Sequence, residues 1–214
     1  MLNIIIVSDD IDAIIGANCV LSCQHLNDAV DLSNQNVTLL NGNLCGPADV
    51  ESAIVSFNQE RFILVAYSHG SEETLFSTVA SNGYVSSTNA YQFANSLVYT
   101  NSCWSGVKLK EELIKEGCFG FVGYTDLVKL PYNEEDDLLF IECENKGLVH
   151  LLTTDSSLTE SVEEMKKQYR KQYNEFVDQQ MNVSAALLLH NLGCLTFYDY
   201  HGLTRSELES QQIG

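Results

Sequence analysis

Short apolar runs, separated mostly by segments of helical spacing, are the feature that most constrains how this chain can fold. They lie at residues 2–7, 36–40, 62–67, 97–100 and 119–124. A continuous apolar run that is rich in β-branched residues indicates a strand covered on both faces. Residues 17–32, 47–57 and 107–116 carry apolar side chains at helical spacing. The alternation predicts an α/β fold, a three-layer sandwich with a mostly parallel central sheet flanked by helices.

The chain beyond residue 126 follows a different pattern. Pro131 and an acidic run at residues 133–137 interrupt it. We expect a mobile or processed loop over residues 127–147, although acidic residues also favour the first turn of a helix. Residues 157–180 have the spacing of a long amphipathic helix, and residues 194–198 can add a late strand. A chain of 214 residues fits one domain. We divide it into a core at residues 1–126, the loop, and a helical part at residues 148–200.

The charge of the chain limits its partners. Eleven basic residues against 29 acidic residues give a formal net charge of −18. A phosphate backbone or an anionic membrane surface would be repelled, so we expect neither nucleic acid nor membrane as a partner. No apolar run is long enough to predict a membrane span. A basic peptide or protein would be attracted, while the same acidity can also serve solubility alone.

The seven cysteines are odd in number and show no zinc-like spacing. Several lie inside apolar runs, where a free thiol behaves as a small core residue. The N-terminus lacks the basic segment of a signal peptide and resembles a first strand instead. These features predict a reduced, cytoplasmic protein without a disulfide framework, and we expect no metal and no cofactor.

Two of the apolar runs end next to a reactive side chain. His69 follows the run at residues 62–67, and Cys103 follows the run at residues 97–100. In an open parallel sheet, ligands bind in the crevice beyond the carboxyl ends of the strands. An imidazole there could make or stabilise a thiolate, so the pattern predicts a cysteine nucleophile with a histidine partner. Singly, His69 could be a structural turn residue and Cys103 one more buried thiol.

The segments 67–70 (YSHG) and 101–106 (NSCWSG) together resemble the caspase-like cysteine peptidases. That group includes caspases, metacaspases, legumains, separases, gingipain-type enzymes and bacterial CHAT domains. The motif is most similar to metacaspases and CHAT-type bacterial homologues. Asn101 and Trp104 stand where metacaspases carry Asp and His. The similarity in order and spacing extends from about residue 2 to residue 126.

The resemblance implies a caspase-like fold and a cysteine endopeptidase. Cys103 would attack the peptide carbonyl, and His69 would protonate the leaving amine. The backbone N–H groups of Gly70 and Cys103 would form the oxyanion hole. The family also implies regulated proteolysis of a protein or peptide substrate, including bacterial antiviral defence, and a latent form released by an activating partner protein or by cleavage.

The pocket for the residue before the scissile bond lies, in this family, at the ends of the first, third and fourth strands. This chain has no arginine at its first strand, but Asp9, Asp10 and Asp12 follow it. Carboxylates suit a Lys or Arg side chain. We therefore expect cleavage after a basic residue, with Asp9, Asp10, Asn101 and Asp126 binding the substrate. Aspartates at such positions also cap helices.

Two other functions fit the same residues. The chain could be a caspase-like module that has lost catalysis and serves as a binding or scaffold subunit, as the departures at Asn101 and Trp104 allow. It could also be a thiol hydrolase or acyltransferase on a flavodoxin-like sheet, acting on small esters or amides but not on peptides. His201 is the rival of His69 as base, but the local motifs of papain-like enzymes are missing around Cys103.

Overall fold

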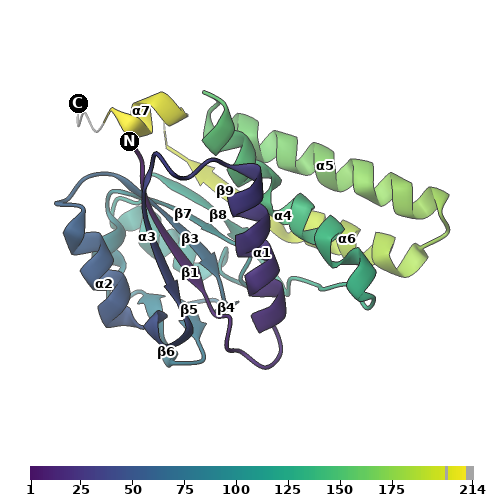
Figure 1. Cartoon of the computed structure of the whole chain (residues 1–214), viewed down its shortest axis with the longest axis horizontal. Coiled ribbons are helices and arrows are strands. Elements are labelled where there is room, and N and C mark those ends of the chain that lie inside the picture. Colours follow the sequence, from purple (N-terminus) through teal and green to yellow (C-terminus); the bar gives the residue numbers. More distant parts are fainter. Residues whose placement is uncertain (201, 211–214) are drawn as a thin grey trace.

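A computed structural model describes residues 1–200 and 202–210. The strands of its central sheet are β1 (Asn3–Ser8), β2 (Asn36–Asn41), β3 (Phe62–Tyr67), β7 (Ser96–Thr100), β8 (Gly120–Tyr124) and β9 (Leu195–Asp199). Within the described residues the sheet has six strands in the order β2-β1-β3-β7-β8-β9 (Figure 1). The first five run parallel, and β9 pairs antiparallel with β8. The predicted late strand is therefore confirmed.

Helices cover both faces of this sheet. Their bounds are α1 (Gly16–Ala29), α2 (Pro47–Ser56), α3 (Lys108–Lys115), α4 (Asp137–Thr153), α5 (Leu158–Asp178), α6 (Asn182–Cys194) and α7 (Arg205–Glu209). Short 3-10 turns occur at η1 (Gly42–Leu44), η2 (Ala90–Phe93) and η3 (Glu134–Asp136). Side chains of α1, α4, α5 and α6 form one core with the sheet, and side chains of α2 and α3 form the other. Figure 1 shows α4, α5 and α6 gathered on one side of the molecule. The predicted three-layer α/β architecture is confirmed.

Strand β3 shows why the strand sequences are apolar throughout. Ile63, Val65 and Tyr67 belong to one core, whereas the alternate residues Leu64 and Ala66 belong to the other. Because successive side chains of a strand point to opposite faces, a strand between two helical layers needs apolar residues at every position. All six residues of β3 are buried. The segment that follows β3 is thus built on a fully buried strand.

A small antiparallel sheet continues directly from β3. It consists of β4 (His69–Gly70), β5 (Thr74–Ser77) and β6 (Ala80–Ser86). In this sheet His69 pairs with Phe76. The imidazole therefore lies on a paired strand immediately beyond the central sheet, which restricts its position.

The predicted loop at residues 127–147 is too long. Residues 125–133 lack helix or strand, whereas η3 occupies residues 134–136 and α4 begins at Asp137. Phe140, Cys143 and Leu148 recur at helical spacing and join the core, so burial of this face stabilises a helix there. The acidic run forms η3 and the start of α4, as expected where acids meet a helix N-terminus.

The long polar helix predicted at residues 157–180 is confirmed as α5. Ser157 and Glu160 form a capping box at its start. The hydroxyl of Ser157 accepts from the Glu160 backbone, and the Glu160 carboxylate accepts from the Ser157 backbone at 2.8 Å. Within the described residues, no helix is both long enough and apolar enough to cross a membrane.

Candidate active site

Strand register brings the two motif segments together. Ala66 of β3 pairs with Thr100 of β7, so the residues that follow each strand start side by side. The Thr100 hydroxyl donates to the Ala66 carbonyl at 2.9 Å, and the Ser102 hydroxyl donates to the Ser68 carbonyl at 2.7 Å. These buried hydrogen bonds fix the segment of His69 against the segment of Cys103.

Gly70 lies directly against the backbone of Cys103. A Cβ atom at position 70 would lie 2.5 Å from the Cys103 carbonyl oxygen and 2.7 Å from the Ser102 Cβ. Real Cβ atoms do not approach other atoms this closely, so only glycine fits here. The two residues predicted to form an oxyanion hole are therefore neighbours in space, and that role stays a prediction.

Cys103 differs from the other cysteines. The other six are buried, whereas Cys103 is partly exposed, and all seven are free. The backbone N–H of Val128 donates to its Sγ atom at 3.3 Å. Burial raises the pKa of the Cys103 thiol, and the hydrogen bond from Val128 opposes that rise. The thiol is therefore protonated at neutral pH unless a partner takes the proton.

The residue after Cys103 has an unusual backbone. Trp104 has a φ of 52°, in the left-handed region that bulky residues seldom adopt. Its N–H donates to the Asp126 carbonyl at 3.1 Å, and Gly106 N–H donates to the Tyr124 carbonyl at 2.8 Å. These bonds hold a sharp turn that projects Cys103 beyond the end of β7. Strained residues of this kind cluster at functional sites.

His69 is held by a carboxylate and by an aromatic ring. Its Nε2 atom lies 3.1 Å from Oδ2 of Asp12, and its ring stacks on Phe76 with centroids 5.3 Å apart. Because an ionised carboxylate can only accept, Nε2 carries a hydrogen and Nδ1 is the atom left for another partner. Asp12 thus fixes both the orientation and the tautomer of the imidazole.

Asp12 is itself fixed at the start of α1. Its Oδ1 atom accepts from the backbone N–H groups of Ile14 at 2.8 Å and Ile15 at 2.9 Å. Burial acts to raise the pKa of Asp12, but these N–H donors and the His69 imidazole outweigh it and lower the pKa to about 2. Asp12 is therefore ionised at neutral pH.

Cys103 and His69 line one small cavity. Its volume is about 70 Å³, and Ser68, Asn101 and Glu144 supply polar groups to its wall. The remaining wall is mostly apolar, from Ile15, Cys19, Val128 and Leu130. The cavity is small and partly open to solvent.

The residues predicted to bind substrate lie in different places. Asn101 lines the cavity. Asp9 is buried and accepts from the Thr78 N–H at 2.8 Å, and Asp10 accepts from the Gly42 N–H at 2.7 Å. Asp126 lies on the exposed loop, where its carboxylate accepts from the Leu127 N–H. Asp9, Asp10 and Asp126 do not line the cavity that contains Cys103.

Two residues of this site were not found from the sequence. Glu144 lies three residues after Ile141 and four before Leu148, on the buried side of α4. Had residues 137–153 been recognised as a helix, that spacing would have placed a carboxylate on its apolar face. The contact of Val128 with Cys103 uses only a backbone N–H, for which side-chain patterns carry no signal.

Among the described residues, the other histidines, His25, His150 and His190, do not line this cavity. His25 contacts Asn145 between α1 and α4, and His190 contacts the carbonyl of Leu127. His201, the predicted rival base, lies outside the described residues. In the part of the chain that the structure describes, no three His, Cys, Asp or Glu side chains are arranged to hold a metal ion.

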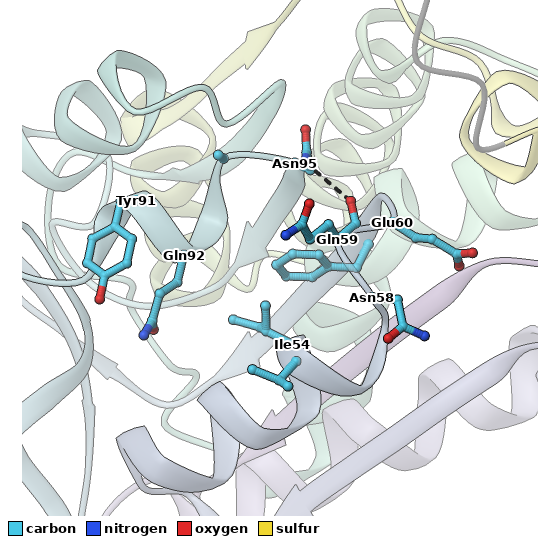
Figure 2. Close-up of a pocket in the computed structure, with 10 residues that line it drawn as sticks. Ile54, Asn58, Gln59, Glu60, Tyr91, Gln92 and Asn95 are labelled. Carbon is cyan, nitrogen blue, oxygen red and sulfur yellow. Dashed lines mark hydrogen bonds between the residues drawn. The ribbon is translucent and has the colours of Figure 1, made fainter.

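A larger cavity lies at the opposite end of the sheet. It has a volume of about 520 Å³ and lies beside Phe62, at the amino end of β3 (Figure 2). Asn58, Gln59 and Gln92 supply amides to its wall, which contains neither cysteine nor histidine. Size alone would favour this cavity, but Cys103 and His69 lie at the smaller one.

Comparison with known proteins assigns no family. No protein-family model matches the chain, and no curated protein matches its sequence. The function has to be argued from the geometry and chemistry of the site.

Proposed function

We propose that this chain is a cysteine endopeptidase of the caspase-like type, in which Cys103 is the nucleophile and His69 the acid–base partner. The observation that carries the proposal is the cavity shared by the two side chains at the carboxyl end of adjacent strands. The close packing of Gly70 on Cys103 and the YSHG and NSCWSG segments add to it. The substrate is a protein or peptide.

The chemistry requires one proton carrier and one nucleophile. His69 Nδ1 takes the proton of the Cys103 thiol, and the thiolate forms a C–S bond to the carbonyl carbon. The negative charge moves to the carbonyl oxygen, where the N–H groups of Gly70 and Cys103 are the proposed donors. The C–N bond then breaks as His69 gives its proton to the leaving amine. Water, deprotonated by His69, hydrolyses the thioester and releases the acid and the thiol.

Asp12 acts through His69 and is a positioning residue. Its carboxylate stabilises the imidazolium that forms when His69 takes the thiol proton. It also keeps the hydrogen on Nε2, so that Nδ1 is the basic atom before the first step. The stacked ring of Phe76 limits rotation of the imidazole.

The loop over the site supports a latent form of the enzyme. Its backbone at Lys129 is held by Asn191, whose side chain accepts from the Lys129 N–H at 2.8 Å and donates to its carbonyl at 2.9 Å. The adjacent Val128 N–H bonds to the Cys103 thiol. The same loop contacts the thiol and lines the cavity through Leu130, so we expect its displacement by a partner protein or by cleavage to raise the activity.

Covalent labelling tests the proposal. A peptidyl acyloxymethyl ketone, which needs both an activated thiol and a peptide site, is incubated with the full chain and its adduct is mapped by mass spectrometry. We expect the adduct on Cys103 alone, formed at least about 100-fold more slowly in His69→Ala. Equal rates in the two proteins, or an adduct spread over several cysteines, would contradict the dyad. Fast labelling by iodoacetamide without reaction with the ketone would favour the thiol hydrolase instead.

A further inference from the structure

A buried carboxylate that this hydrolysis does not use lies beside the cavity. Glu144 of α4 is 2% exposed, and its Oε2 atom accepts from Asn101 Nδ2 at 3.1 Å. Its Oε1 atom is shielded from solvent and has no hydrogen-bond donor among residues 1–200 and 202–210. A buried carboxylate oxygen without a donor is strongly unfavourable, so its presence calls for a ligand.

No positive charge of the described residues compensates Glu144. None of the ion pairs within 4.0 Å includes it. Burial raises the pKa of Glu144 to about 7, and only the hydrogen bond from Asn101 opposes that rise. Asp136 is also buried, but the Ser184 hydroxyl donates to it at 2.7 Å. Asp9 also has a buried oxygen without a donor, but it does not line the cavity.

The position of Glu144 relates it to the reaction. It lines the same cavity as Cys103, and its partner Asn101 precedes the nucleophile by two residues. Ile15, Val128 and Leu130 contribute apolar groups to the wall of the same cavity. An aliphatic stem that ends in a cation matches this combination, because the stem packs on apolar groups while the charge meets the carboxylate.

We propose that Glu144 is the specificity-determining residue of this site and accepts a hydrogen bond from the Lys or Arg side chain that precedes the scissile bond. The inference rests on the proposed peptidase function. Asn101 is a positioning residue, since its amide holds Oε2 and leaves Oε1 free. In this proposal, the carboxylate that binds the basic side chain comes from α4, and not from Asp9 or Asp10, which follow β1.

The pocket opens together with the loop over the nucleophile. Val128 and Leu130 belong to that loop, and both line the cavity of about 70 Å³. Moving them would lengthen the cavity toward solvent while Glu144 stays on the buried face of α4. The net charge of −18 favours the approach of a basic segment.

The first test compares ketone probes that differ only in the residue next to the reactive group. Lysine is compared with norleucine, which has a similar aliphatic stem without the ammonium group, at pH 8. We expect wild-type Cys103 to react at least about tenfold faster with the lysine probe. Glu144→Gln should lower that ratio to about one. Glu142→Gln, on the same helix but not fully buried, should leave the ratio unchanged.

The second test needs no reaction at Cys103. n-Butylammonium is added to the full chain at pH 8, with butanol as a control, and the melting temperature is measured. We expect the ammonium to stabilise the wild type and not Glu144→Gln. An equal effect on both proteins, or a lysine preference that survives in Glu144→Gln, would overturn the role of Glu144.

The two proposals can fail separately. Every peptidyl probe could leave Cys103 unmodified while butylammonium stabilises the wild type and not Glu144→Gln. That result would support the cation site and contradict the peptidase. If the probes label Cys103 without preference for lysine, the peptidase stands and the role of Glu144 is wrong.

Discussion

Nε2 of His69 lies 3.1 Å from Oδ2 of Asp12, so a carboxylate that follows β1 holds an imidazole that follows β3. The next strand in the sheet is β7, which precedes Cys103. Carboxylate, imidazole and thiol thus come from three adjacent parallel strands, in that order along one edge of the sheet. This order agrees with the proposed transfer of a proton from Cys103 to a His69 supported by Asp12.

Asp12→Asn should show whether Asp12 only holds the backbone before α1 or also sets the tautomer of His69. The Oδ1 atom that accepts from Ile14 and Ile15 in the turn before α1 is kept, so the stability of the protein should change little. The new amide replaces Oδ2 with a donor that faces Nε2 of His69, and this puts the imidazole hydrogen on Nδ1. We expect kcat/KM to fall by about 10²–10⁴. Asp10→Asn is the control, because Asp10 accepts from the Gly42 N–H through Oδ1 and asparagine keeps that acceptor. Unchanged kcat/KM in Asp12→Asn would show that Asp12 only holds the turn before α1.

Gly70→Ala should displace the two motif segments from each other. The added Cβ would lie 2.5 Å from the Cys103 carbonyl oxygen, so the backbone must shift. We expect a loss of about 1–3 kcal/mol in the free energy of unfolding and strongly reduced labelling of Cys103. Gly193→Ala is the matched control, because a Cβ there meets no atom within 4 Å and the position is helical. Urea unfolding and the rate of ketone labelling measure both effects. Normal labelling in Gly70→Ala would mean that close packing of the segments is not needed.

Asn191→Ala should release the loop over the nucleophile. This buried side chain accepts from the Lys129 N–H and donates to the Lys129 carbonyl, and alanine would remove both hydrogen bonds. We expect faster alkylation of Cys103 by iodoacetamide and faster proteolysis at residues 125–133. Leu189→Ala, at an exposed position of α6, should change neither rate. If Asn191→Ala leaves the alkylation rate as it is, the loop does not restrict the thiol.

The sheet and the reactive pair could be predicted from the sequence because each depends on local patterns. The strand at residues 62–67 is apolar at every position, and β3 has the same bounds. His69 and Cys103 follow from where such strands end. Glu144 could not be predicted, because a single carboxylate on α4 acquires its role only when the helix packs beside β7. The role of Asp12 depends likewise on a contact between segments far apart in sequence.

Glu144 should make stability depend on pH. Its pKa is about 7 in the folded protein, against a usual value of 4.5, so the folded state keeps a proton that the unfolded state loses. The contribution of Glu144 to stability is therefore greatest below about pH 4.5 and is lost as the pH rises to about 7, a change of up to about 3 kcal/mol. Burial raises the pKa values of the nearby Tyr67, Tyr99 and Cys143, so these groups stay neutral over that range.

Replacement of Glu144 by Gln isolates this effect. The variant should be more stable than the wild type by about 1–3 kcal/mol at pH 8 and nearly equal to it at pH 4.5. Urea unfolding at several pH values measures the difference, and Glu142→Gln should show no such trend. A stability difference that is the same at pH 4.5 and pH 8 would mean that Glu144 does not titrate in this window. A more stable variant without lysine preference would indicate that the carboxylate serves function at the expense of stability.

Peptide cleavage is the measurement that we would make first. The Asn191→Ala protein, with its loop loosened, is incubated with a peptide library, and the same protein carrying Cys103→Ala is run beside it. We expect new termini after Lys or Arg in the first protein and none in the second. Cleavage that persists without Cys103 would contradict a peptidase built on Cys103 and His69. Absence of cleavage would also contradict it if the ketone probe labels Cys103 at the same rate with and without His69.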